Sequence, residues 1–169
     1  TFRKIKSKDL ILEGNYFGLN VLEKDNGIWK IRNSIPEFDL STRFFELADN
    51  NKLIVVHGYK GVYKLELDEL FENLKSIEID SLSISGNPSL ANFNDKIYYK
   101  NKNGMYYYDE INNNFLIDSL LSKAANPTGL IRADNDKLWV FSDNNIFYAS
   151  KDEVNNKVSL KSVLIPKKQ

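Results

Sequence analysis

The sequence predicts an all-β fold of four consecutive blades, each with four antiparallel strands, and two repeated markers support this prediction. The first marker is a polar turn followed by an apolar strand, and its first apolar residues are Leu10, Leu53, Ile97 and Leu138. The second is a hairpin residue that accepts a positive φ, at Gly18, Gly61, Gly104 and Asn145. The steps are 43, 44 and 41 residues for the first marker and 43, 43 and 41 for the second. Two independent markers on one period indicate a genuine repeat.

Each repeat contains four short strand-like segments, which is typical of a β-propeller blade. In the second repeat these segments cover 43–48, 52–57, 61–67 and 74–80. In the others they cover 2–6, 9–13, 18–23 and 27–32, then 89–93, 96–100, 104–109 and 115–118, and finally 128–133, 137–142, 145–149 and 157–165. The blades are therefore expected over about 1–35, 42–80, 88–119 and 127–166. The chain, 1–169, is interpreted as one β-propeller segment of a larger ring.

Within the second repeat, the apolar pattern predicts where each strand lies between the axis and the rim. Segment 52–57 is apolar without alternation, as expected of an interior strand covered on both faces. Segment 61–67 alternates more and 74–80 is half polar, so the last strand is expected to be half exposed. The helical candidates, 68–73 and 119–125, are expected to be single turns. Trp29 and Trp139 are expected to pack between blades, because large aromatic side chains dominate cores.

Composition argues against several functional classes. Lys plus Arg and Asp plus Glu balance at 23 each, whereas a nucleic-acid-binding surface is normally basic. The chain has no cysteine, which excludes disulfides, thiolate metal sites and a cysteine nucleophile. No run approaches the roughly 20 apolar residues of a membrane-spanning helix. The chain starts at Thr1 with neither a start methionine nor a signal peptide, so we expect it to begin within a longer protein.

Two segments resemble the two-component-regulator propeller repeat. One is 138–147, which reads Leu-Trp-Val-Phe-Ser-Asp-Asn-Asn-Ile-Phe, and the other is 55–64, which reads Val-Val-His-Gly-Tyr-Lys-Gly-Val-Tyr-Lys. The second is similar to the propellers of Bacteroidetes regulators that carry a triple-tyrosine domain and a LuxR-type helix-turn-helix after the propeller. All four repeats take part in the resemblance. Two departures are Asn145 in place of the turn glycine and Tyr98 in place of the tryptophan.

The resemblance implies a non-enzymatic sensory or ligand-binding portion of a bacterial transmembrane transcriptional regulator. The parent protein would have an export signal, about seven or more blades, a membrane segment and a DNA-binding domain. A periplasmic location, a homodimer, and contacts with the remaining blades and the triple-tyrosine domain are further expectations. No nucleic acid is expected to bind through this segment.

The predicted ligand-binding residues lie in the hairpins between the second and third strands, which gather around the channel mouth of a propeller. His57, Tyr59 and Lys60 combine hydrogen-bonding and stacking groups that suit a carbohydrate or a peptide. The equivalent hairpins, the first of which also holds Phe17, contribute Asn15, Tyr16, Asn101, Lys102, Asn103, Asp143 and Asn144. The alternative is that these residues only form turns, with Tyr59 packed on a neighbouring blade.

Motifs for catalysis, metal binding or cofactor binding are missing from the sequence. His57 is the single histidine, and neither a Gly-x-Ser-x-Gly motif nor a phosphate loop occurs. The polar runs 134–136 and 143–145 offer oxygen ligands, but they lack the twelve-residue loop and closing Glu of a calcium site. We therefore expect no catalytic residue, no metal and no cofactor.

Two other functions stay open. A propeller lyase or hydrolase acting on polysaccharide would need converging carboxylates, Tyr or His at the channel mouth, where His57 and Tyr59 are the candidates. A pure protein-interaction scaffold would bind no small ligand.

Overall fold

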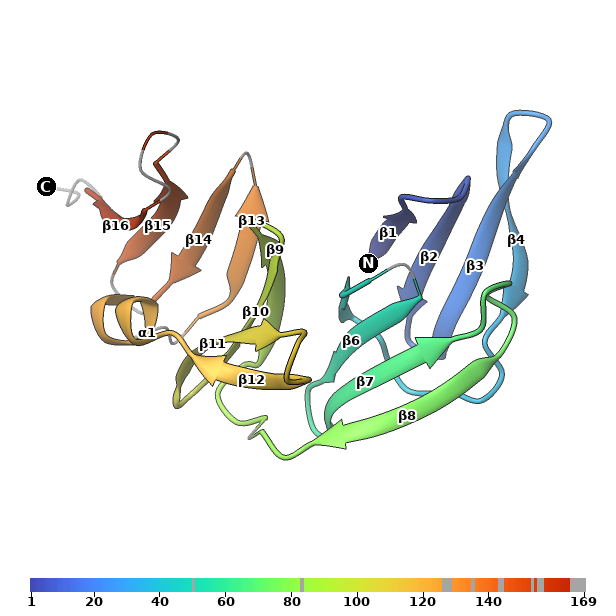
Figure 1. The fold of residues 1–169 in the computed structure, drawn as a ribbon, viewed down its shortest axis with the longest axis horizontal. Coiled ribbons are helices and arrows are strands. Elements are labelled where there is room, and N and C mark those ends of the chain that lie inside the picture. The colour runs from blue at the N-terminus through green and yellow to red at the C-terminus, as the bar shows by residue number, and fades with distance from the viewer. Residues whose placement is uncertain are drawn as a thin grey trace, which may run out of the picture. The chain divides into compact units, whose positions relative to one another are not determined.

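A computed structural model describes residues 1–49, 51–82, 84–125, 129–134, 136–142, 145–152, 154 and 157–164 of the chain. The strands form four separate four-stranded antiparallel sheets, each with its strands hydrogen-bonded in chain order (Figure 1). The chain divides into two compact units, unit 1 (Thr1–Leu82) with sheets 1 and 2, and unit 2 (Ser83–Gln169) with sheets 3 and 4. Four antiparallel meanders in one chain confirm the predicted fold class, an all-β arrangement of propeller-type blades.

Each sheet occupies one sequence repeat. Sheet 1 consists of β1 (Phe2–Ile5), β2 (Leu10–Asn15), β3 (Gly18–Asp25) and β4 (Ile28–Ser34). Sheet 2 consists of β5 (Phe44–Leu47), β6 (Lys52–His57), β7 (Gly61–Leu67) and β8 (Leu74–Asp80). Sheet 3 consists of β9 (Ser89–Phe93), β10 (Lys96–Asn101), β11 (Gly104–Asp109) and β12 (Asn114–Ile117). Sheet 4 consists of β13 (Ile131–Asp134), β14 (Lys137–Phe141), β15 (Ile146–Lys151) and β16 (Val158–Val163).

The burial gradient of the second blade matches the apolar pattern. β6 is buried at four consecutive positions, Leu53 to Val56, so both of its faces are covered. β7 is mostly buried, and β8 is exposed along most of its length. An interior strand and a solvent-facing outer strand are therefore encoded in the same short repeat.

The hydrogen-bond register places the first marker of the first blade one residue later than the sequence predicted. In the other blades, the residue before the turn lies four positions after the marker, at His57, Asn101 and Ser142. In sheet 1 that residue is Asn15, which pairs with Gly18, so the residue equivalent to Leu53 is Ile11 rather than Leu10. The first step of the repeat is then 42 residues. The run from Leu10 to Leu12 is apolar throughout, so its pattern does not specify which residue faces which side.

The two segments expected to be single helical turns differ. The segment 119–125 forms a helix of seven residues, α1 (Ser119–Ala125), whose start is capped by Asp118 Oδ1 accepting the Leu121 amide at 2.9 Å. The segment 68–73 is a turn in which the Asp68 carboxylate accepts the amides of Glu72 and Asn73, at 2.8 and 3.2 Å. Among the described residues, no helix is long and apolar enough to cross a membrane.

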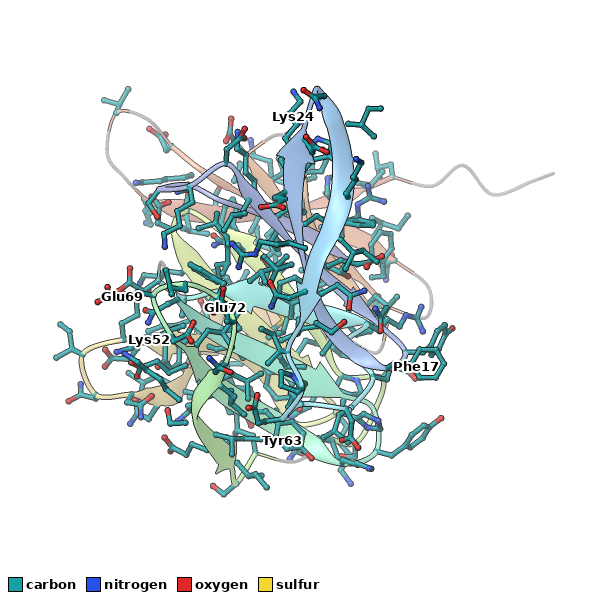
Figure 2. The ribbon with its side chains drawn as sticks, turned by 90° about the vertical axis from the view of Figure 1, so that its right-hand side faces the viewer. Phe17, Lys24, Lys52, Tyr63, Glu69 and Glu72 are labelled. Atoms are coloured by element: carbon teal, nitrogen blue, oxygen red, sulfur yellow. The ribbon has the colours of Figure 1, made fainter. Side chains whose placement is uncertain are left out.

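The two tryptophan side chains contact residues of their own sheets, and Trp29 packs on no other sheet of its unit. Trp29 lies on the outer strand β4, is 36% exposed, and has the Lys24 ammonium 6.0 Å from its ring centroid. Figure 2 shows Lys24 near the tip of the β3–β4 hairpin. Trp139 packs against Tyr148 of the neighbouring strand, with 5.4 Å between ring centroids and 47° between the ring planes. Position on an outer strand limits how much of a large ring is covered.

Each unit has one hydrophobic core, shared by its two sheets. In unit 1 it includes Leu12 and Val21 of sheet 1 with Val55 and Leu65 of sheet 2. In unit 2 it includes Ala91 and Tyr98 of sheet 3 with Leu138 and Val140 of sheet 4. The sheets of a unit therefore stabilise each other through apolar burial.

An ion pair joins the two first strands of unit 1. The Arg3 guanidinium donates from Nε to Glu46 Oε2 at 2.6 Å and from Nη2 to Glu46 Oε1 at 2.5 Å. Glu46 is buried, whereas the Arg3 side chain is partly exposed. The bidentate geometry compensates the carboxylate for the water that it loses.

Arg3→Met is expected to lower the free energy of unfolding by about 3 kcal/mol at neutral pH, because it leaves the buried Glu46 carboxylate without its cation. The double variant Arg3→Met/Glu46→Met should recover most of this loss, since it removes both charges. Urea unfolding followed by circular dichroism measures both values. Equal destabilisation in the single and double variants would contradict a buried charge as the cause.

Candidate functional site

The predicted site residues lie in the turns that join the second and third strands of each sheet, here termed the b–c turns. These are the β2–β3, β6–β7, β10–β11 and β14–β15 connections. The residue before the turn has a common role in three of them. Asn15 Oδ1 accepts the Phe17 amide at 2.7 Å, and Asn101 Oδ1 accepts the Asn103 amide at 2.8 Å. These side chains hold the turn backbone in one conformation.

His57 performs the same role in the β6–β7 turn with an imidazole in place of an amide. Its Nδ1 accepts the amides of Tyr59 and Lys60, both at 3.2 Å. An accepting Nδ1 requires the neutral tautomer with the proton on Nε2, so Nε2 remains as a donor. Partial burial, together with the charge of Lys60, lowers the pKa of His57 below its ordinary value of 6.5.

The two b–c turns of unit 1 lie at the same end of the unit. The Thr42 amide donates to the Asn15 carbonyl at 2.8 Å, and its hydroxyl donates to the Gly18 carbonyl of the same turn. Two residues later, Phe44 pairs with Val56, which precedes His57. Because two residues span at most about 7 Å, the segment 42–44 holds the two turns close together.

The b–c turns of unit 2 are joined in a similar way. Ser89 pairs with Lys100, beside the β10–β11 turn, and its Oγ accepts the Ile131 amide at 3.2 Å. Ile131 in turn pairs with Val140, close to the end of β14. A hydroxyl residue therefore connects neighbouring b–c turns in each unit.

Three aromatic side chains project from the turn end of unit 1. Tyr16 is 82% exposed, Phe17 87% and Tyr59 91%, and Figure 2 shows Phe17 at the outer edge of its hairpin. These are the aromatic residues of the described part of the chain whose exposure exceeds four-fifths. We term them the aromatic turn face. Tyr59 packs on no described sheet, and its ring centroid lies 6.3 Å from that of His57.

The predicted residues are divided between the two units. Unit 1 brings together Asn15, Tyr16, His57, Tyr59 and Lys60, where Lys60 is exposed and Asn15 and His57 are half-buried. Unit 2 carries Asn101, Lys102 and Asn103. Of these, Asn101 is fully buried under its turn, and Lys102 and Asn103 are exposed. Asp143 and Asn144 lie outside the described residues.

Sequence reasoning missed Arg43, which lies between the two b–c turns of unit 1. It is exposed, its guanidinium carbon is 5.0 Å from the centroid of the Phe44 ring, and it makes no ion pair with a described residue. Stacking on Phe44 restricts the guanidinium while leaving its N–H groups able to donate. Its position at the start of the predicted strand 43–48 was the available signal, because a first strand starts at the same end of the sheet as the b–c turn.

Comparison with known proteins supports the fold. Among solved structures, the chain is similar to the crystal structure of an auxiliary nutrient binding protein from Bacteroides ovatus, with a TM-score of 0.60 and 12% sequence identity. The match covers 98% of this chain and 42% of that chain, so this chain spans less than half of that protein's length. No protein-family model and no curated protein matches the sequence.

Acidification is expected to loosen the β6–β7 turn, because protonated Nδ1 no longer accepts the amides of Tyr59 and Lys60. The pKa of His57 is lower in the fold than the ordinary 6.5. The unfolded chain therefore binds this proton more readily. The contribution to stability is fully present above pH 6.5 and is lost as the pH falls through the folded pKa. Amide hydrogen exchange at Tyr59 and Lys60 across this pH range, expressed as protection relative to the intrinsic exchange rate at each pH, measures the effect.

His57→Asn is the matched control, since asparagine holds the equivalent turns at Asn15 and Asn101. This variant should keep the turn and lose the pH dependence of the protection at Tyr59. An unchanged pH dependence in His57→Asn would show that another group is responsible.

Proposed function

We propose that this chain is a non-enzymatic, carbohydrate-binding portion of a β-propeller, and that the aromatic turn face of unit 1 is its binding surface. The observation that carries the proposal is the concentration of Tyr16, Phe17 and Tyr59, each more than 80% exposed, at one end of one unit. Exposed aromatic groups of this kind mark interaction sites, since each leaves a large apolar area in water.

Aromatic rings recognise a sugar by stacking on the apolar C–H face of its ring. Phenol hydroxyls of Tyr16 and Tyr59 add hydrogen bonds to sugar hydroxyls at the ring edge. The neutral His57 side chain supplies an Nε2–H donor beside Tyr59, with 6.3 Å between the two ring centroids. Stacking surface and donors therefore occur together, as carbohydrate binding requires.

Cationic donors complete the surface. Lys60 and Arg43 are exposed near the same turns, and Arg43 is oriented by Phe44. Both donate to hydroxyl or carboxylate oxygens of a ligand. Because the Asn15 and His57 side chains fix the turn backbones, little conformational entropy of these turns is lost on binding.

The wider setting is also part of the proposal. The resemblance of 55–64 to regulator propellers supports a sensory segment of a membrane-anchored bacterial regulator, with this part in the periplasm. The similarity to a protein described as nutrient binding supports a binding role over a catalytic one. A peptide ligand, a protein scaffold and an enzyme acting on polysaccharide are the outcomes that the binding experiment distinguishes.

Replacement of Tyr59 by Ala is expected to weaken binding of the best oligosaccharide about fivefold, from the loss of about 1 kcal/mol of stacking. Tyr16→Ala/Phe17→Ala should weaken it further, since two rings are removed. A glycan array identifies the ligand, and isothermal titration calorimetry measures the dissociation constants. Ile111→Ala is the matched control, because Ile111 is 94% exposed on a turn of unit 2 and should leave binding unchanged.

Three results would overturn this function. If no glycan on the array binds, the scaffold function is favoured. If only peptides bind, the ligand class is peptide rather than carbohydrate. If the wild type cleaves a polysaccharide and His57→Ala does not, the chain is an enzyme.

A further inference from the structure

Each sheet has a front row and a rear row of side chains, which the register defines. Residues directly opposite one another on paired strands share a face. The rear rows are Phe2–Glu13–Asn20–Ser34 in sheet 1, Phe45–Val55–Tyr63–Ile79 in sheet 2 and Ile131–Val140–Phe147–Ser162 in sheet 4. The front rows are Arg3–Leu12–Val21–Asn33 in sheet 1, Ala91–Tyr98–Tyr107–Leu116 in sheet 3 and Arg132–Trp139–Tyr148–Lys161 in sheet 4.

The rear rows of sheets 2 and 4 are contact surfaces within their units. The rear row of sheet 2 packs on the front row of sheet 1, and that of sheet 4 on the front row of sheet 3. Their first residues are correspondingly buried, with Phe45 1% and Ile131 4% exposed. The equivalent residue of sheet 1, Phe2, is 58% exposed. Sheet 1 therefore carries an apolar residue at a contact position that no described sheet of its unit covers.

The front face of sheet 4 repeats the front face of sheet 3. In sheet 3, the Lys96 ammonium lies 4.6 Å from the Tyr107 ring centroid, and this face packs against sheet 4. In sheet 4, Lys137 lies 5.3 Å from the Tyr148 centroid at the equivalent positions. Trp139 occupies the place of Tyr98 and is only half-buried. The chain thus carries both halves of a sheet-on-sheet contact, one in each unit.

The two faces carry the two members of a residue pair that already makes a contact inside unit 1. Between sheets 1 and 2, the front-row Arg3 guanidinium lies 6.0 Å from the centroid of the rear-row Phe45 ring. Sheet 4 has Arg132 at the position of Arg3, and sheet 1 has Phe2 at the position of Phe45. An Arg132–Phe2 contact between two chains would therefore repeat an arginine–aromatic contact that the fold already uses.

The polar residues are also complementary. The sheet 1 rear row contains Glu13, which accepts from Asn20 at 2.8 Å, at a position where sheets 2 and 4 have valine. A carboxylate at a contact position needs a cation on the opposing surface. The front row of sheet 4 supplies Arg132 and Lys161, both exposed.

We propose that the front row of sheet 4 packs on the rear row of sheet 1 of a second copy of this chain. The contact is head to tail, so each copy uses two different surfaces. It buries Phe2 and Trp139, places Arg132 over Phe2 and pairs Glu13 with a cation of sheet 4.

Sedimentation velocity or light scattering after gel filtration tests the contact. The wild-type chain is expected to have at least twice the 19.5 kDa mass of one chain. Phe2→Lys, which blocks sheet 1, and Trp139→Glu, which blocks sheet 4, should each reduce it to the mass of one chain. An equimolar mixture should return to twice the mass of one chain, because each variant keeps the surface that the other lacks. Ile111→Lys, at an exposed turn outside both surfaces, should associate like the wild type.

A wild-type chain with the mass of one chain, or either variant associating like the wild type, overturns the proposal. So does a mixture of folded variants that stays at the mass of one chain, since it removes the pairing of unlike surfaces. Circular dichroism confirms that each variant is folded. If one is not, Ile31→Lys on the sheet 1 face and Lys161→Glu on the sheet 4 face replace the pair, with the same expected results.

Discussion

A sheet with apolar side chains on both faces needs a second layer against each face, and this requirement organises both units. β6 illustrates it, with four consecutive buried residues, so neither face of sheet 2 is free at its centre. The exposure of β8 follows from the same rule, because an outer strand has fewer neighbours and accepts polar residues. The short four-stranded repeat is therefore one layer of a larger assembly of layers.

The same layered arrangement determines where the chain can display residues. The first strand of the second sheet must enter beside the b–c turn of the first, and a hydroxyl group makes the junction in each unit. Thr42 bonds the carbonyl of Gly18 in unit 1, and Ser89 accepts the amide of Ile131 in unit 2. These bonds satisfy backbone groups that would otherwise be buried without partners. They also collect neighbouring turns at one end, where side chains from separate strands can act on one ligand.

Much of the fold was predictable because it depends on local pattern. The strands at 52–57, 61–67, 74–80, 89–93 and 104–109 have the bounds that were predicted. The register of the first blade was not, since Leu10, Ile11 and Leu12 are all apolar and hydrogen bonding alone decides between them. The exposure of Trp29 depends on which strands surround it, which periodicity does not encode. Arg43 was missed for a similar reason, because hydrogen bonds from Thr42 place it between two turns that are distant in sequence.

A comparison of the b–c turns shows which of their residues the turn conformation requires. Asn15 and Asn101 hold their turns with the same side-chain oxygen and the same backbone amide two residues later. Between Asn15 and Gly18 the chain carries Tyr16 and Phe17, whereas the equivalent positions after Asn101 are Lys102 and Asn103. The turn conformation therefore does not demand aromatic tips, and polar tips serve equally well in unit 2. Tyr16 and Phe17 stay more than 80% exposed in unit 1, so their rings add little burial to the stability of the fold. These two rings are therefore available to a binding partner, as the proposed function requires.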